Sequence, residues 1–187
     1  MAAWGWFVSY LILGILAASS RSQSWMTAFD GHFQFACPAG QSLKHLDSVH
    51  DDHYEDRVWN FSCSVPPHGA YLTECEWSGY QNNFEEILEF QCPNESVITG
   101  IESVNDNGYE DRRWSFQCCV PEGLVTHGCV YTPYINTYDH MLSYRVPDDY
   151  VLRGVDSVTD NKYQDRIFRF DICKLDPIKV EAGVVLG

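Results

Sequence analysis

The sequence predicts an all-β protein built from three related repeats, and three observations support this fold class. Nearly the same motif occurs three times, as DRVWNFSC from Asp56, DRRWSFQCC from Asp111 and DRIFRFDIC from Asp165. Apolar and polar residues alternate around each copy, whereas no window carries the apolar stripe of an amphipathic helix. Cysteines also recur at matching positions of the repeats. Repeats of this kind bury a continuous core only when they pack against one another.

Each repeat contains three stretches with the pattern of strands. HFQFAC places Phe35 and Cys37 on one face, and the DRxW segment does the same for Trp59 and Phe61. Between them lies an apolar stretch, VITGIESV in the second repeat, which leads into an acidic loop. Closing three such units about an axis buries their aromatic faces and limits open sheet edges. We therefore expect a pseudo-threefold arrangement, β-prism-like in preference because the units are short, with a β-trefoil-like fold as the alternative.

Paired absences among the eight cysteines predict the disulfides. Residues 92–119 align with residues 146–173 without a gap, and Cys92 and Cys118 both lack a cysteine counterpart there. Partners are expected to be lost together, because a single loss would leave a free thiol in an oxidising compartment. The same reasoning applied to the other repeats gives Cys37–Cys63, Cys92–Cys118, Cys75–Cys119 and Cys129–Cys173. Zinc-thiolate chemistry is not expected, because the chain has no CxxC pair.

The N-terminus indicates secretion. The run from Trp6 to Ala18 is apolar and uncharged, which is typical of a signal-peptide core and short for a membrane span. No second apolar segment of spanning length follows, so no membrane span is expected. The net charge of -14 argues against nucleic acid as a partner. The expected organisation is a signal peptide over residues 1–22 and a domain over 23–187, with repeats at about 25–64, 75–119 and 129–173 and a tail at 175–187.

The repeated motif is interpreted as structural. Its aromatic residues are bulky core candidates, and burial of each is worth about 1.5–3 kcal/mol. Arg57 has the same strand parity as Trp59, so its guanidinium is expected to meet a carboxylate in a clamp that is used three times. The residues given this role are Asp56, Arg57, Trp59, Asp111, Arg112, Trp114, Asp165, Arg166 and Phe168.

Catalytic and cofactor signatures are missing from the sequence. The seven histidines form no HExxH motif, and neither GxSxG nor a phosphate-binding loop occurs. The acidic loops raise the alternative of calcium, but NDNG at 105–108 lacks a full loop ending in a bidentate glutamate. We therefore expect neither an enzyme nor a bound cofactor or metal.

The repeated D-R-x-W-x-F/Y-x-C motif, the preceding C-P and the double cysteine after the second copy resemble the dermatopontin family over residues 25–174. The resemblance implies a secreted, non-enzymatic extracellular matrix protein. Such a protein mediates cell adhesion and collagen fibril assembly by binding a decorin-like proteoglycan, with growth factor or a cell-surface receptor as further partners. Invertebrate members are described as haemagglutinins. The alternative is therefore a multivalent lectin with a defensive role, whose three repeats present similar glycan pockets.

Two further groups of residues are candidate sites. Asn60 and Asn94 begin sequons for N-glycosylation, and Asn60 should face solvent because its parity is opposite to that of Trp59. If the motif arginines are clamped, few free cations remain to hold a sulfated chain. The candidate glycosaminoglycan patch then consists of Arg113, Arg153, Lys162 and Arg169.

Overall fold

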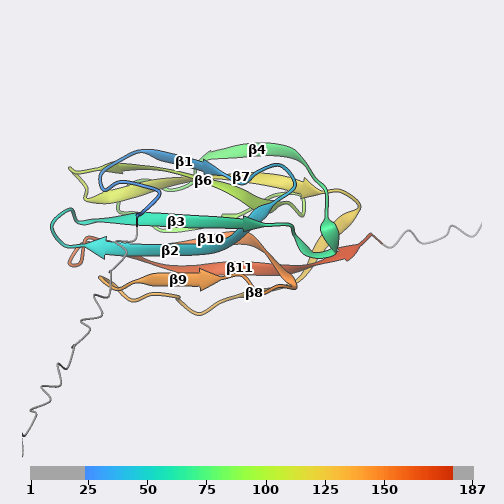
Figure 1. Ribbon diagram of the computed structural model, residues 1–187. Coiled ribbons are helices and arrows are strands. Elements are labelled where there is room, and N and C mark those ends of the chain that lie inside the picture. The colour runs from blue at the N-terminus through green and yellow to red at the C-terminus, as the bar shows by residue number, and fades with distance from the viewer. Residues whose placement is uncertain (1–23, 179–187) are drawn as a thin grey trace, which may run out of the picture.

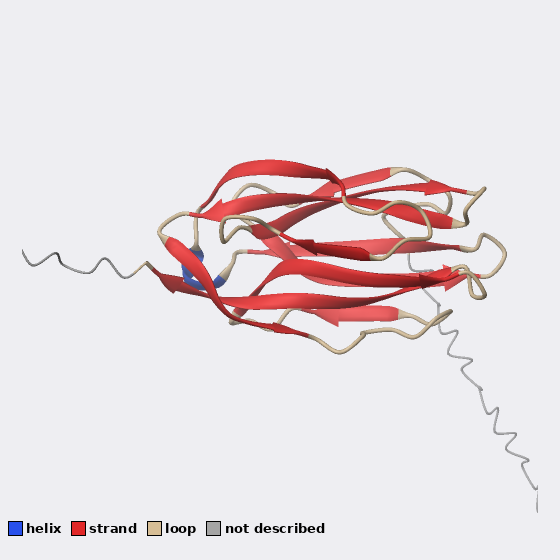
Figure 2. Ribbon diagram, turned by 180° about the vertical axis from the view of Figure 1, so that it is seen from behind, coloured by secondary structure: helices blue, strands red, loops and turns tan. Residues whose placement is uncertain are grey.

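The computed structural model describes residues 24–178, which form eleven strands and one short 3-10 helix, Pro67–Gly69 (Figures 1 and 2). The strands run along the long direction of the molecule, and every strand pair is antiparallel. This confirms the predicted all-β class. The predicted signal peptide and residues 179–187 of the tail lie outside the described residues.

The strands form three sheets. The first has the order β1-β6-β7-β4, with β1 Phe33–Ala36, β6 Val97–Asp106, β7 Asp111–Pro121 and β4 Leu72–Tyr80. The second has the order β5-β10-β11-β8, with β5 Leu88–Gln91, β10 Tyr150–Asp160, β11 Asp165–Pro177 and β8 Leu124–Tyr131. The third has the order β3-β2-β9, with β3 Asp56–Ser64, β2 Ser42–Asp51 and β9 Leu142–Arg145.

The repeats exchange strands. Each sheet is centred on the hairpin of one repeat, and the short strand before the hairpin pairs with the hairpin of another repeat. Thus β1 pairs with β6, β5 with β10, and β9 with β2. No repeat therefore completes a sheet alone, as expected for units that need their neighbours. The rotational relation between the repeats, and with it the choice between a prism-like and a trefoil-like fold, stays a prediction.

The motif aromatics lie at the centre of the core. Trp59, Trp114 and Phe168 are 2–3% exposed, and each ring meets the other two edge-on, with centroids 5.3–5.6 Å apart. Edge-to-face contacts suit the ring quadrupole and add about 0.5–1.5 kcal/mol per pair to the burial term. Each hairpin therefore contributes one aromatic residue to a cluster at which the three sheets meet. This is the core role predicted from the repeats.

The four disulfides of the structure join the predicted partners. Adjacent cysteines point to opposite sides of β7, so Cys118 lies in the main core while Cys119 belongs to a second apolar cluster near Leu72 and Val97. Cys75–Cys119 ties β4 to β7, and Cys129–Cys173 ties β8 to β11. These bridges hold the outer strands on their sheets.

A glycine in β10 allows the close approach of β5. The β10–β11 register shifts between Leu152 and Gly154, so the strand bulges there. A Cβ on Gly154 would lie 2.6 Å from the carbonyl oxygen of Phe90 and 3.1 Å from the Cβ of Asp171. Gly100 occupies the same place beside β1, where a Cβ would lie 2.8 Å from the carbonyl oxygen of Phe35. Gly100, the glycine of VITGIESV, therefore leaves room for β1 of the first repeat to pair with β6.

Within residues 24–178, no helix is long and apolar enough to cross a bilayer.

Candidate functional site

The Asp-Arg pairs of the motif form a closed ring of ion pairs. Each arginine binds the aspartate of a different repeat through two N–O contacts of 2.6–2.7 Å, and all six side chains are 1–4% exposed. The pairs are Arg57–Asp165, Arg112–Asp56 and Arg166–Asp111. The predicted clamp is therefore present, and it links all three repeats.

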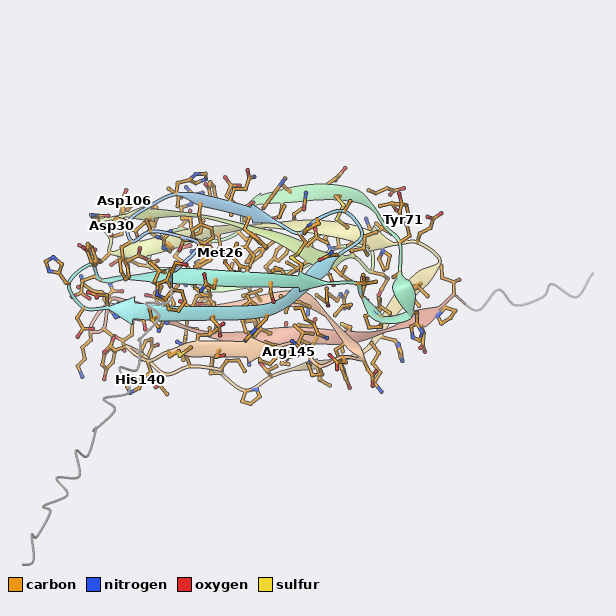
Figure 3. All side chains as sticks on the ribbon, in the orientation of Figure 1. Met26, Asp30, Tyr71, Asp106, His140 and Arg145 are labelled. Carbon is orange, nitrogen blue, oxygen red and sulfur yellow. A yellow bond between two sulfur atoms is a disulfide. The ribbon has the colours of Figure 1, made fainter. Side chains whose placement is uncertain are left out.

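The carboxylates of the ring also bond to the loop that precedes the short first strand of their own repeat. Each accepts a backbone N–H, at 2.6–2.8 Å, from a residue with positive φ. The donors are Asp30 for Asp56, Glu85 for Asp111 and Asp139 for Asp165. Asp30, Asp106 and His140 mark this end of the molecule in Figure 3. Because the aspartates are buried and each is paired with an arginine, we interpret the ring as structural.

A stacked aromatic pair accompanies each acidic turn. The turn tyrosine lies nearly parallel to an aromatic residue of an adjacent loop, with centroids 4.5–5.0 Å apart and interplanar angles of 4–8°. The pairs are Phe29–Tyr54, Phe84–Tyr109 and Tyr138–Tyr163. Their sequence signal is the tyrosine that precedes each motif aspartate, in YED and YQD. One face of each tyrosine is thus covered by the protein itself.

A groove lies between β4 and β5, which are edge strands of two different sheets. It encloses about 1140 Å³ when its open mouth is counted. Trp77 supplies an aromatic surface, while carboxylate, amide and hydroxyl groups line the rest. These polar residues are Glu74, Glu76, Ser78, Gln81, Glu89, Gln91, Asn94 and Ser96.

A second hollow adjoins the other side of β5 and shares Glu89, Phe90 and Gln91 with the groove. The amide of Gln91 donates to Tyr131 Oη and to Asp171 Oδ2, both at 3.0 Å. We call the groove and this hollow together the β5 groove.

The floor of the β5 groove holds a charged pair beneath an aromatic ring. Arg169 binds Asp156 Oδ2 at 2.8 Å, and its guanidinium lies 4.8 Å from the centroid of Tyr131. Burial raises the pKa of the Asp171 carboxyl, and burial together with Asp156 and Asp171 raises the pKa of Tyr131. The Tyr131 hydroxyl, which accepts the Gln91 amide, is protonated at neutral pH like that of any tyrosine and keeps a proton to donate.

The chemistry of the β5 groove suits sugar hydroxyls. Binding sites for small polar ligands combine aromatic surface with a few oriented donors and acceptors, and this groove has both. Carboxylates outnumber cations along the β5 groove, which is lined by Glu74, Glu76, Glu89 and Asp156 but by one arginine, Arg169. Their field opposes a sulfated chain more than a neutral one.

A serine-histidine contact within residues 24–178 does not have the geometry of nucleophilic catalysis. Ser143 Oγ lies 3.4 Å from His45 Nε2, but the same nitrogen faces Asp47 Oδ1 at 3.3 Å. A catalytic imidazole needs one nitrogen for the nucleophile and the other for the orienting carboxylate. This serine is therefore not activated.

Two groups of side chains in residues 24–178 have ligand atoms close enough for a metal ion. One consists of Cys129, Cys173 and Asp171, but the two sulfurs are joined in a disulfide and are not thiolates. The other consists of His50, Asp139 and Asp165, whose donor atoms lie within 4.8 Å of one another.

The four predicted patch residues are not gathered on one sheet. Arg113 lies in β7 and stacks on Tyr80 at 4.8 Å, whereas Arg153, Lys162 and Arg169 belong to β10, the following turn and β11. Arg169 is already paired with Asp156. A glycosaminoglycan patch of these residues stays a prediction.

The two predicted glycosylation sites differ in exposure. Asn94 is exposed at the rim of the β5 groove. Asn60 is only partly exposed, and its Oδ1 accepts the backbone N–H of Met26 at 2.8 Å. Both modifications stay predictions, and the structure favours Asn94.

Comparison with known proteins places the chain in a family. The Dermatopontin family profile matches residues 27–177. The chain is 36% identical over 167 residues to the hemagglutinin/amebocyte aggregation factor of Limulus polyphemus, covering 88% of the chain and 95% of that protein. It is 37% identical over 142 residues to a dermatopontin of Biomphalaria glabrata (76% and 94%) and 36% identical over 154 residues to cytotoxin-1 of Millepora dichotoma (82% and 68%). No solved structure matches significantly. The chain belongs to the dermatopontin family.

Proposed function

We propose that this protein is a secreted, non-enzymatic adhesion protein of the extracellular matrix that acts by binding carbohydrate at more than one site. The observation that carries the proposal is the β5 groove, where Trp77 and Tyr131 supply aromatic surface, Gln91 supplies a donor and an acceptor, and Arg169 supplies donors. The motif arginines do not contribute, because their charges are neutralised in the ring.

A related surface on the first sheet supports multivalency. Tyr80 of β4 stacks on an arginine as Tyr131 does on Arg169. The Arg113 guanidinium lies 4.8 Å from the Tyr80 ring centroid. Burial and the nearby Glu102 raise the pKa of Tyr80, as burial and Asp156 do for Tyr131. Two glycan-binding faces on one chain would allow it to cross-link cells, in line with the printed name of the Limulus relative.

The match to dermatopontins favours a second candidate, matrix assembly through a decorin-like proteoglycan and collagen fibrils. The clamped arginines and the acidic groove favour contact through neutral glycans or core protein over contact through sulfated chains. Growth factor or a cell-surface receptor would be further partners of the same matrix role.

A glycan array with the purified full-length secreted protein separates the candidates. The lectin proposal expects saturable binding to neutral glycans that changes little between 50 and about 300 mM salt, because few ion pairs form. Binding confined to sulfated chains, and lost as salt rises, would reject it in favour of the proteoglycan role.

Variants test whether the β5 groove is the site. Tyr131→Phe removes one hydroxyl and keeps the ring, and we expect about 3- to 10-fold weaker glycan binding from one lost hydrogen bond. Gln91→Ala should weaken binding at least as much. Gln41→Ala, in a turn that does not line the groove, is the matched control. Equal affinities for all three variants and the wild type would place the site elsewhere.

A further inference from the structure

His50 is a buried imidazole without a hydrogen-bond partner. It lies near the end of β2, beside the ring of ion pairs, and its side chain is 1% exposed. Neither ring nitrogen makes a hydrogen bond within the described residues. A buried polar group without a partner costs about 1–3 kcal/mol, so such groups are rare unless something else satisfies them.

The surroundings of His50 are acidic. Its Nδ1 lies 3.3 Å from Asp52 Oδ1 and 3.7 Å from Asp139 Oδ1, and its Nε2 lies 4.0 Å from Glu55 Oε2. Asp139 and Asp165 each place a carboxylate oxygen within 4.8 Å of the imidazole and of each other. His50 thus faces carboxylates that come from two repeats.

These spacings fit donors that share one ion. Nitrogen and oxygen ligands lie about 2.0–2.2 Å from zinc, so neighbouring ligands of a tetrahedral site are about 3.3–3.6 Å apart. The distances from His50 Nδ1 to Asp52 and Asp139 lie close to this range. A hydrogen bond from imidazole to carboxylate would be shorter than either.

We propose that His50, Asp139 and Asp165 form a binding site for a first-row divalent cation of the zinc type. Asp52 is the fourth candidate ligand, because its side chain is 86% exposed and free to turn toward the ion. An imidazole with carboxylates suits zinc and its neighbours, whereas calcium takes oxygen ligands. The sequence predicted no metal here, because no ligand spacing along the chain reveals a site assembled from two repeats.

The other repeats provide an internal comparison. The register partner of Arg112 is Asn105 and that of Arg166 is Thr159, where Arg57 has His50. The loop carboxylate is present at all three corners, as Asp139, Asp30 and Glu85. Only the His50 corner adds an imidazole, so we expect one ion per chain. An ion there would join repeats one and three beside the Arg57–Asp165 pair.

Calorimetric titration of the secreted protein tests the site, after chelator treatment and with zinc chloride as the probe at pH 7.4. The wild type should bind one zinc ion saturably, and zinc should raise its melting temperature because only the folded state holds the ligands together. His50→Asn introduces the residue that the second repeat has at this position, Asn105. We expect at least a tenfold loss of zinc affinity, about 1.4 kcal/mol.

His53→Asn is the matched control, because His53 is exposed in the turn that follows β2. It should leave the affinity and the stoichiometry unchanged. If His50→Asn fails to fold, Asp139→Asn replaces it, since that side chain is 35% exposed and the change keeps its shape. Absence of saturable zinc binding by the wild type, or equal affinity in the wild type and the ligand variants, would overturn the proposal.

Discussion

Removal of one carboxylate from the ring should destabilise the whole domain. Asp111 binds Arg166 at 2.6 and 2.7 Å, and both side chains are 4% exposed. Asp111→Ala would leave the guanidinium buried without its counter-charge. It would also remove the acceptor of the Glu85 backbone N–H.

The magnitude follows from the burial of the pair. Breaking a buried ion pair by removal of one partner costs about 3–5 kcal/mol, because the remaining charge cannot reach water. For a domain of this size, about 1 kcal/mol shifts the melting temperature by about 2–4 °C, so we expect a fall of roughly 6–20 °C. The free energy of unfolding of a domain is only about 5–15 kcal/mol, so a large part of the variant's stability would be lost.

Urea unfolding with intact disulfides, followed by tryptophan fluorescence, to which the buried Trp59 and Trp114 contribute, measures the effect. Arg113→Ser is the matched control, because Arg113 is a nearby arginine that is partly exposed and stacks on Tyr80. Its substitution should lower the free energy of unfolding by no more than about 1 kcal/mol. The double variant Asp111→Leu with Arg166→Met should lose less free energy of unfolding than Asp111→Ala, because it leaves no buried unpaired charge. A loss below about 1 kcal/mol for Asp111→Ala would refute the reasoning.

Three other outcomes are expected. Gly154→Ala should lower the free energy of unfolding by about 1–3 kcal/mol in denaturant titrations, because its Cβ would clash with the backbone of Phe90; an unchanged value would contradict the close strand approach. The raised pKa of Asp171 means that folding binds its proton more tightly, so its favourable contribution is complete below about pH 3.8 and is lost as pH rises through the folded-state pKa. The free energy of unfolding of Asp171→Asn minus that of the wild type should therefore grow from pH 3 to 7, and a shrinking difference would reverse the sign. Intact-mass analysis should show a glycosidase-sensitive mass that disappears in Asn94→Gln and persists in Asn60→Gln, and Asn94→Gln should bind glycans more tightly because the groove rim is cleared; the reverse pattern would contradict the exposure argument.

Features that repeat along the chain could be predicted from the sequence. Paired absences of cysteines identified disulfide partners because the constraint acts on both ends of a bridge together. The parity of Trp59 and Arg57 identified core and clamp residues, because side-chain direction in a strand is set locally. These predictions needed only the alignment of one repeat with another.

Features that depend on how the repeats meet could not be predicted in the same way. The parity of Arg57 shows the face it occupies, but its partner Asp165 lies 108 residues away and is selected by the packing of two hairpins. The β5 groove has no motif either, because Trp77 and Gln91 belong to edge strands of different sheets. His50 occupies the strand position that Asn105 and Thr159 hold in the other repeats, and this difference was its only sequence signal.

The distribution of similarity between the repeats argues against three equivalent binding sites. The ring and the aromatic core recur at all three positions, whereas the outer strands do not: β4 and β8 complete the first two sheets, and the third has three strands within the described residues. Trp77 and Tyr131 come from those outer strands, so the sequence-based expectation of three similar pockets reduces to two related faces that differ in detail. Agglutination by two unlike sites requires both, because a chain with one working site cannot bridge cells. Tyr131→Phe should therefore reduce agglutination by more than it reduces affinity for a single glycan, and equal reductions would indicate that one face is sufficient.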